Sequence, residues 1–124
     1  MPKLVFLPQP SLPGVIDRPR EDRRVQGNPE RTTFNHYDSP DKMVSAGIWQ
    51  CQPGKWRIQF AADKEEFFAV LAGRVRVADA QDQGHEVGPG EALVIPAGFT
   101  GSFEVIEAVR KYYVIVDRSA RVAS

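Results

Sequence analysis

The sequence is poor in the residues that build metal and redox sites. Its 124 residues include one cysteine, Cys51, and two histidines, His36 and His85. A single thiol cannot form an internal disulfide, so the composition indicates a reducing compartment, and we expect a cytoplasmic protein. A lone cysteine in an apolar strand is more often a small buried hydrophobe than a ligand or a reactive thiol. Each histidine is likewise expected to be a surface or hydrogen-bonded side chain.

Excess charge and long apolar runs are also lacking. The chain has 16 Lys plus Arg and 16 Asp plus Glu, and its formal net charge is zero. Such a balance provides no bulk attraction for nucleic acid or for an anionic membrane surface. The apolar run at residues 4–7 is shorter than the ~7–15 residues of a signal peptide, and no segment approaches the ~20 of a membrane span. We therefore expect neither nucleic acid nor membrane as a partner.

What the sequence does contain is a succession of short apolar runs separated by Gly, Pro and Asp. Residues 55–60 alternate between polar and apolar side chains, which is the period of a half-buried strand. Many short strands with regular turn signals predict an all-β sandwich or barrel. We assign the barrel to residues 32–117, an extended N-terminal arm to 1–31 and a loose tail to 118–124. Residues 8–31, rich in Pro, Gly and charge, are interpreted as a solvated lead-in rather than a dedicated binding arm.

Residues 61–72 favour a helix on propensity alone. Asp63 followed by Glu66 resembles a capping box, and Gly73 is a suitable C-terminal stop. Helix and strand are nearly even at this point. The flanking strands and the motif described next favour a strand from Glu66 to Leu71.

Two motifs in this part of the chain resemble the two signatures of the cupin superfamily. In the first signature, five residues separate a glycine from a His-x-His pair, which is followed by a glutamate and a second glycine. In the second, five residues separate a glycine from a Pro-x-Gly turn, and a histidine follows the turn. The resemblance covers residues 43–116 and is closest to small single-domain cupins related to ureidoglycine aminohydrolase and ethanolamine-utilisation protein Q. The residues that carry the spacings are Gly54, Glu66 and Gly73, then Gly90, Pro96 and Gly98.

The resemblance implies a single-domain antiparallel jelly-roll barrel with an internal cavity. Metal-binding cupins hold their ion with three imidazoles and one carboxylate. In this sequence only Glu66 remains, because Phe60, Ala62 and Gly101 stand at the histidine positions. One carboxylate cannot satisfy a transition metal that requires about four to six ligands. We therefore expect no metal and no cofactor at this position.

The period-two rule then predicts which side chains face the barrel interior. Phe60 and Ala62 point inward if they occupy the histidine positions, and Gly101 does the same in the second motif. Either Tyr112 or Tyr113 lines the remaining wall. Plain core packing explains the aromatic residues about equally well. The predicted ligand-binding residues are Trp49, Cys51, Trp56, Phe60, Phe68, Phe103 and Tyr113.

Glu66 is the predicted residue for ligand contact or proton transfer. An unpaired carboxylate in apolar surroundings is costly, so Glu66 is either protonated or paired with Arg57 or Lys111. In a catalytic site Glu66 is the general acid or base and Lys111 the electrostatic stabiliser. A register slip of one residue would instead bring Glu65 inside.

Three functions follow in order of preference. The first is metal-free binding of a small polar metabolite, of the amine or ureide class, in the barrel cavity. The second is a structural or assembly role, with a homodimer formed through an edge strand at residues 32–37. The third, implied by the resemblance, is a metal-dependent hydrolase acting on ureido compounds.

Overall fold

The computed structural model describes residues 1–7 and 13–123, with side chains to residue 120. Strands dominate these residues, so the all-β prediction is confirmed, and strand β6 runs through the segment where a helix was the alternative. Two short 3-10 helices are η1 (Glu21–Arg23) and η2 (Arg118–Ala123). The strands are β1 (Val15–Asp17), β2 (Arg24–Gln26), β3 (Arg31–Asp38), β4 (Val44–Cys51), β5 (Gly54–Gln59), β6 (Lys64–Asp79), β7 (Gly84–Val87), β8 (Ala92–Ile95) and β9 (Thr100–Asp117).

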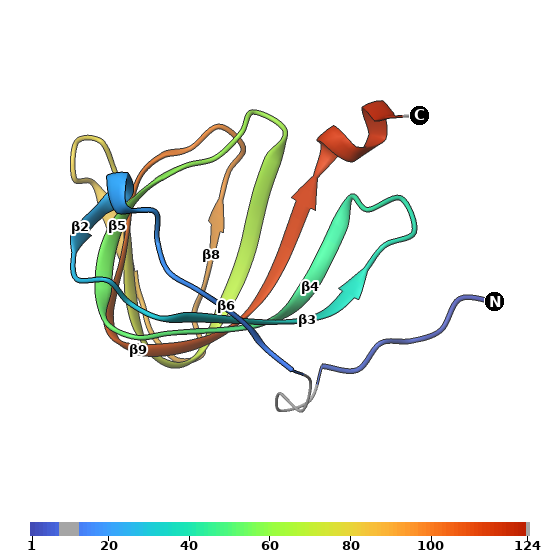
Figure 1. The fold of residues 1–124 in the computed structure, drawn as a ribbon, viewed down its shortest axis with the longest axis horizontal. Helices are drawn as coiled ribbons and strands as arrows, with labels where there is room; N and C mark the ends of the chain where they lie inside the picture. The colour runs from blue at the N-terminus through green and yellow to red at the C-terminus, as the bar shows by residue number, and fades with distance from the viewer. Residues whose placement is uncertain (8–12, 124) are drawn as a thin grey trace.

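The long strands β6 and β9 form the backbone of one curled, nine-stranded antiparallel sheet. One half of β9 pairs with β5 and the other half with β4, so β9 joins the two sides of the curl (Figure 1). β6 also pairs with β7 and β8. Register shifts between Val70 and Val75 interrupt the β6–β9 ladder, and such bulges allow a long pair of strands to bend sharply.

The inner face of the curl holds the core, and the predicted register of β6 is correct. Phe68 and Val70 are fully buried, whereas Phe67 and Leu71 are exposed. Glu66 therefore faces inward with Phe68, and the alternative in which Glu65 faces inward does not occur. Each large apolar side chain buried in this way stabilises the fold by about 1.5–3 kcal/mol.

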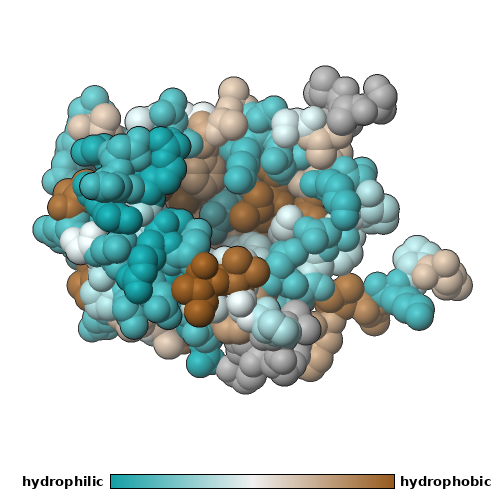
Figure 2. Space-filling view, in the orientation of Figure 1, coloured by the Kyte–Doolittle hydropathy of each residue, from teal (hydrophilic) through white to brown (hydrophobic). Residues whose placement is uncertain are grey.

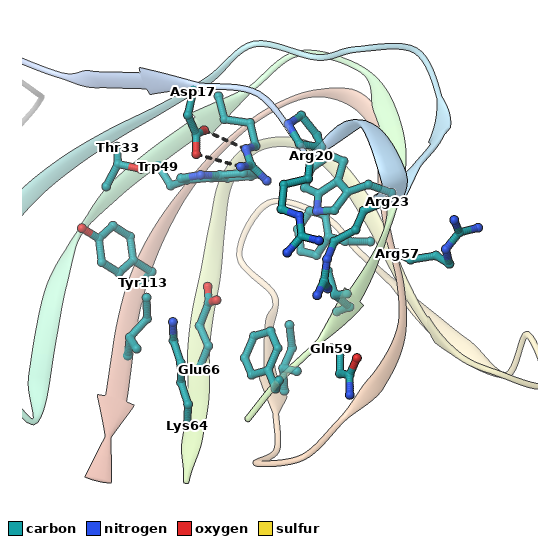
Figure 3. Close-up of a pocket in the computed structure, with 18 of the residues that line it drawn as sticks. Asp17, Arg20, Arg23, Thr33, Trp49, Arg57, Gln59, Lys64, Glu66 and Tyr113 are labelled. Atoms are coloured by element: carbon teal, nitrogen blue, oxygen red, sulfur yellow. Dashed lines mark hydrogen bonds and ion pairs between the residues drawn. The ribbon is translucent and has the colours of Figure 1, made fainter. Parts of the chain in front are cut away.

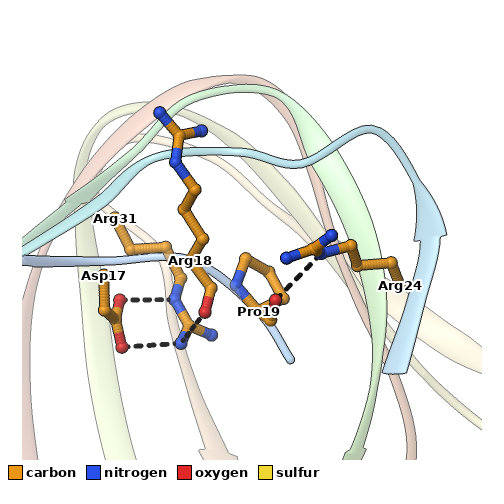
Figure 4. A network of polar contacts seen from close by, with 5 residues as sticks. All are labelled: Asp17, Arg18, Pro19, Arg24 and Arg31. Atoms are coloured by element: carbon orange, nitrogen blue, oxygen red, sulfur yellow. Dashed lines mark hydrogen bonds and ion pairs between the residues drawn. The ribbon is translucent and has the colours of Figure 1, made fainter. Parts of the chain in front are cut away.

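The N-terminal segment differs from the solvated lead-in that we expected. β1 pairs with β3, and β2 pairs with β5. Two hydrogen bonds of 2.8 and 2.7 Å join Arg31 to the Asp17 carboxylate, and Arg24 Nε donates to the Pro19 carbonyl at 2.9 Å (Figure 4). These contacts hold residues 15–26 against the barrel. Residues 8–12 of the predicted arm and Ser124 of the predicted tail lie outside the described residues.

The edge strand expected at residues 32–37 is only partly open. β3 pairs with β4 along its length, and β1 covers its other side at Arg31, Thr32 and Thr33. The free edge of β3 is therefore limited to residues beyond Thr33.

Among the described residues, no helix has the length and apolar character needed to cross a membrane.

Two glycines with the same backbone conformation, one in β6 and one in the turn before β8, allow a test of how closely β6 and β9 must approach at the bend. Gly73 and Gly90 have φ of +84° and +83°. A Cβ on Gly73 would lie 2.1 Å from the Ala108 carbonyl oxygen, whereas a Cβ on Gly90 would meet nothing within 4 Å. We expect Gly90→Ala to lower the free energy of unfolding by about 1–2 kcal/mol, the cost of the left-handed conformation. Gly73→Ala should cost about 3 kcal/mol or more, because β9 must also move.

Urea denaturation of both variants measures the two costs. Equal losses would show that β6 and β9 separate at Gly73 without penalty, and that the bend does not depend on this close approach.

Candidate functional site

A cavity of about 730 Å³ lies inside the curl of the sheet (Figure 3). Its walls come from β3, β4, β5, β6, β8 and β9, and the N-terminal segment adds residues to its mouth. In the space-filling view, hydrophobic side chains are visible near the centre of a face that is otherwise mostly hydrophilic (Figure 2). The structure brings together here most of the predicted site residues: Trp49, Trp56, Phe60, Glu66, Phe103, Lys111 and Tyr113.

The floor of the cavity is an ion pair between neighbouring strands. Lys111 Nζ lies 2.7 Å from Glu66 Oε2, and the two side chains are only 5% and 13% exposed. Lys111 is opposite Val70 in the β6–β9 ladder, so its side chain extends along the sheet to reach Glu66. The pairing that the sequence offered as an alternative for Glu66 is therefore formed, with Lys111 and not with Arg57.

Three aromatic rings surround the Lys111 ammonium. Nζ lies 4.1 Å from the ring centroid of Phe68, 4.7 Å from that of Trp49 and 5.0 Å from that of Phe103. A cation over an aromatic face gains more when it is desolvated, as it is here. The rings and the carboxylate together compensate for the burial of the positive charge.

The aromatic wall is a packed cluster that begins with a cross-strand pair. Trp56 and Phe103 are direct partners between β5 and β9, and their rings stack at 5.3 Å between centroids. Trp49 meets Phe103 edge-on at 5.7 Å and lies 6.2 Å from Trp56. Packing of this kind fixes the side chains before any ligand arrives.

Tyr113, not Tyr112, faces the cavity. The Tyr113 hydroxyl donates to Asn35 Oδ1 at 2.7 Å. Burial raises the pKa of Tyr113 to about 12, with smaller contributions from the negative charges of Asp38 and Glu66, so the hydroxyl remains a donor at neutral pH. Tyr112 points to the other side, where its hydroxyl lies 3.5 Å from the Leu7 carbonyl.

Two predicted ligand-binding residues do not line the cavity. Phe68 is fully buried, and its ring contacts the Lys111 ammonium without reaching the cavity surface. Cys51 is 4% exposed in the core, and its thiol donates to the Gln52 carbonyl at 3.2 Å. Burial is the main cause that raises the pKa of Cys51 to about 12. At neutral pH this thiol is protonated and unreactive.

The inward orientation expected for Ala62 is wrong, and at Gly101 the structure leaves no room for a side chain. β5 ends at Gln59, so the alternation no longer holds beyond Phe60, and Ala61 lines the cavity while Ala62 is exposed. A Cβ on Gly101 would lie 1.9 Å from the backbone carbonyl oxygen of Ala78. No side chain fits at Gly101, because β6 and β9 approach each other too closely.

The donor set around Glu66 does not fit a transition metal. No group of three or more His, Cys, Asp or Glu side chains lies together in the described part of the chain. Glu66 is itself paired with Lys111. His36 Nδ1 is 2.9 Å from the Phe34 carbonyl oxygen, and His85 is exposed in β7. The residues present therefore offer one carboxylate and an ammonium, which is not a ligand set for a cation.

The basic residues at the mouth of the cavity were missed by sequence reasoning. They are Arg20, Arg23, Arg31 and Lys64, accompanied by Asp17. The only signal for Arg20 and Arg23 was the cluster of charges at residues 17–24, which resembles an ordinary solvated segment, and nothing in the sequence singled out Arg31 or Lys64. The placement of this segment depends on its strand pairing with β3 and β5.

The Glu66–Lys111 pair leads to a stability prediction. Lys111→Met leaves a largely buried carboxylate without a partner and should cost about 3–5 kcal/mol of unfolding free energy. The double variant with Glu66→Gln should lose less than Lys111→Met alone, because no charge is then stranded. As a control, Asp82→Asn breaks the exposed Arg76–Asp82 pair and should have a much smaller effect. Urea denaturation measures all three, and a double variant no more stable than Lys111→Met would contradict the prediction.

Several solved structures share the fold of this chain. No curated protein matches the chain. A DUF861-family protein of unknown function from Pseudomonas syringae aligns with 87% of this chain at 16% identity and a TM-score of 0.75, and the chain spans 46% of that protein's length. The EutQ protein of Clostridium difficile aligns over 79% of each chain at 18% identity and a TM-score of 0.62. The EutQ protein of Salmonella typhimurium aligns over 86% of this chain and 98% of its own, at 16% identity and a TM-score of 0.62.

These structural likenesses establish the fold alone. The family model of the EutQ-like cupin domain matches residues 38–113, which is more than half of the sequence. The matched region runs from the end of β3 to the inward-facing Tyr113 in β9. This chain therefore belongs to the EutQ-like cupin domain family.

Proposed function

We propose that this cupin domain binds a small polar metabolite in its barrel cavity without a transition metal. The observation that carries the proposal is the cavity of about 730 Å³, a size within the ~300–1,000 Å³ of ligand pockets. Its apolar walls are rigid and its polar groups are few, which is also typical of such pockets.

The polar groups indicate how a ligand is oriented. Lys111 occupies Oε2 of Glu66, and Oε1 accepts no hydrogen bond from any described residue. A ligand N–H group directed at Oε1 would complete the hydrogen bonding of this carboxylate. Of the amine and ureide classes, we favour the ureide class, because Lys111 already occupies the aromatic faces that would attract an ammonium group.

A metal-dependent hydrolase related to ureidoglycine aminohydrolase has less support. Glu66 faces the cavity, as a general acid or base must. The side chains at the three histidine positions, however, supply no donor atoms. We therefore rank hydrolysis below metal-free binding and include it in the test below.

The two tryptophans make the ligand proposal measurable. Trp49 and Trp56 are the only tryptophans of the sequence, and both line the cavity. We expect methylurea, hydantoin or ethanolamine at millimolar concentration to change the intrinsic fluorescence, with the ureides binding more tightly. Ile115→Phe narrows the cavity and should weaken binding about tenfold or more. Ile106→Phe, on the same strand but exposed and outside the cavity, is the matched control.

An unchanged fluorescence across the whole panel would contradict the proposal. Turnover of ureidoglycine together with stoichiometric manganese or zinc in the purified protein would favour the hydrolase instead.

We also propose that the domain forms a homodimer. The open part of β3 is short, but the outer face of β6 and β8 offers a larger surface. Phe67 and Val94 are direct cross-strand partners, 45% and 57% exposed, and Leu71 is 37% exposed on the same strand as Phe67. Adjacent exposed apolar side chains of this kind are typical of interaction sites. A second copy of the chain presents the same apolar face and can cover this one by twofold symmetry.

Light scattering of the purified protein tests the dimer. We expect a dimer at micromolar concentration, and we expect Phe67→Lys with Val94→Lys to yield a monomer, since both place a charge in the apolar contact. Val25→Lys, which changes an exposed valine on β2, should leave the mass unchanged. A monomeric unmodified protein would refute the proposal.

A further inference from the structure

The cavity carries a surplus of positive charge that the chain as a whole does not have. The formal net charge of the chain is zero. Among the described residues that line the cavity, six are basic and only two are acidic, Asp17 and Glu66. The basic residues are Arg20, Arg23, Arg31, Arg57, Lys64 and Lys111.

Several of these charges are neutralised within the protein. Lys111 is paired with Glu66 as described above, and Arg31 binds the Asp17 carboxylate with two hydrogen bonds. Arg20 Nη2 donates a hydrogen bond of 2.6 Å to Asp22 Oδ2, and this bond lowers the pKa of the Asp22 carboxyl. None of these three cations therefore adds much to the net charge of the mouth.

Arg23 and Lys64 are different. Neither side chain forms a hydrogen bond or an ion pair with a described residue. Figure 3 shows Arg23 reaching into the cavity from η1 beside Arg20, and Lys64 reaching toward it from the start of β6. Arg57 points away from the cavity in the same view. Asp22 interacts electrostatically with Arg23, and Asp117 with Lys64, but neither carboxylate forms an ion pair with these cations. Two cations without a direct ion-pair partner among the described residues thus line the cavity from separate elements.

The elements that carry these cations are held in place. Arg57 Nη2 donates to the Asp22 carbonyl at 2.8 Å and so ties η1 to β5. Arg24 binds the Pro19 carbonyl, and Asp17 binds Arg31, on either side of η1 (Figure 4). These contacts fix the backbone that carries Arg23, so only the Arg23 side chain has to be ordered when an anion binds.

We propose that Arg23 and Lys64 bind an anionic group of the cavity ligand, a carboxylate or a phosphate. The inference rests on the proposed function, because it names the charged end of the same ligand. A guanidinium fork and an ammonium group are the side chains that recognise these anions. Lys64 lies within residues 38–113 but Arg23 precedes them, so the N-terminal segment adds one of the two cations from outside the part matched by the family model.

Three probes of similar shape test the charge requirement. Phenylacetate, phenyl phosphate and uncharged phenylacetamide are titrated at low salt and followed by the fluorescence of Trp49 and Trp56. We expect at least one of the two anions to bind about tenfold more tightly than phenylacetamide. Added salt should lower the affinity for the anions and leave that for phenylacetamide unchanged. The tighter of the two anions identifies the group as a carboxylate or a phosphate.

Variants then test the residues. Arg23→Gln with Lys64→Gln should weaken binding of the anion by about tenfold or more and leave the affinity for phenylacetamide unchanged. Arg74→Gln with Lys42→Gln removes the same charge at residues that do not line the cavity, and it should leave both affinities unchanged. Urea denaturation checks that both pairs of substitutions leave the protein folded.

The outcomes separate the two proposals. Equal binding of phenylacetamide and the anions, with no effect of the Arg23 and Lys64 substitutions, would overturn the anion site while the cavity remains a binding site. Equal weakening by the control pair would also overturn it, since only long-range charge would then matter. If neither these probes nor the ureide and amine panel bind, the proposed function itself fails.

Discussion

The interior of this barrel depends on one buried ion pair. Lys111 and Glu66 come from adjacent strands and lie mostly out of solvent, so each makes the burial of the other tolerable. The same ammonium contacts the rings of Trp49, Phe68 and Phe103. Three aromatic residues and a carboxylate are thus fixed around a charge that belongs to the protein. The polar floor is rigid because every member of the cluster constrains the others.

This cluster changes the chemistry that a cupin cavity can offer. A carboxylate facing an ammonium group is a hydrogen-bonding surface rather than a cation ligand, and the aromatic faces are already occupied. An incoming ammonium group would compete with Lys111, whereas a neutral N–H donor would meet the open oxygen of Glu66. In the proposed binding mode the interior would favour neutral polar groups, whereas Arg23 and Lys64 at the mouth would favour a negative one. These different preferences at its two ends would orient the proposed ligand.

The N-terminal segment connects the fold to this selectivity. It adds β1 and β2 to opposite ends of the sheet path and places η1 next to β5 at the cavity mouth. The segment contributes few buried apolar side chains, and its position depends on short ladders and polar contacts such as the Asp17–Arg31 pair. The part of the site richest in charge is thus also the part least tied to the core.

Residue types and their spacing were enough to predict the strands and the absence of donor atoms at Phe60, Ala62 and Gly101. For β6 they favoured a strand with Glu66 inward but left a helix and a shifted register open. Alternation of apolar and polar residues is a local signal, and burial of one face enforces it. The partner of Glu66 became clear only from the folded chain, which brings Lys111 to it from 45 residues away in the sequence. The tertiary structure also decided that Cys51 belongs to the core and Arg23 to the cavity. Periodicity assigns a side chain to a face of the sheet, whereas the curl of the sheet and the pairing of distant strands determine what that face encloses.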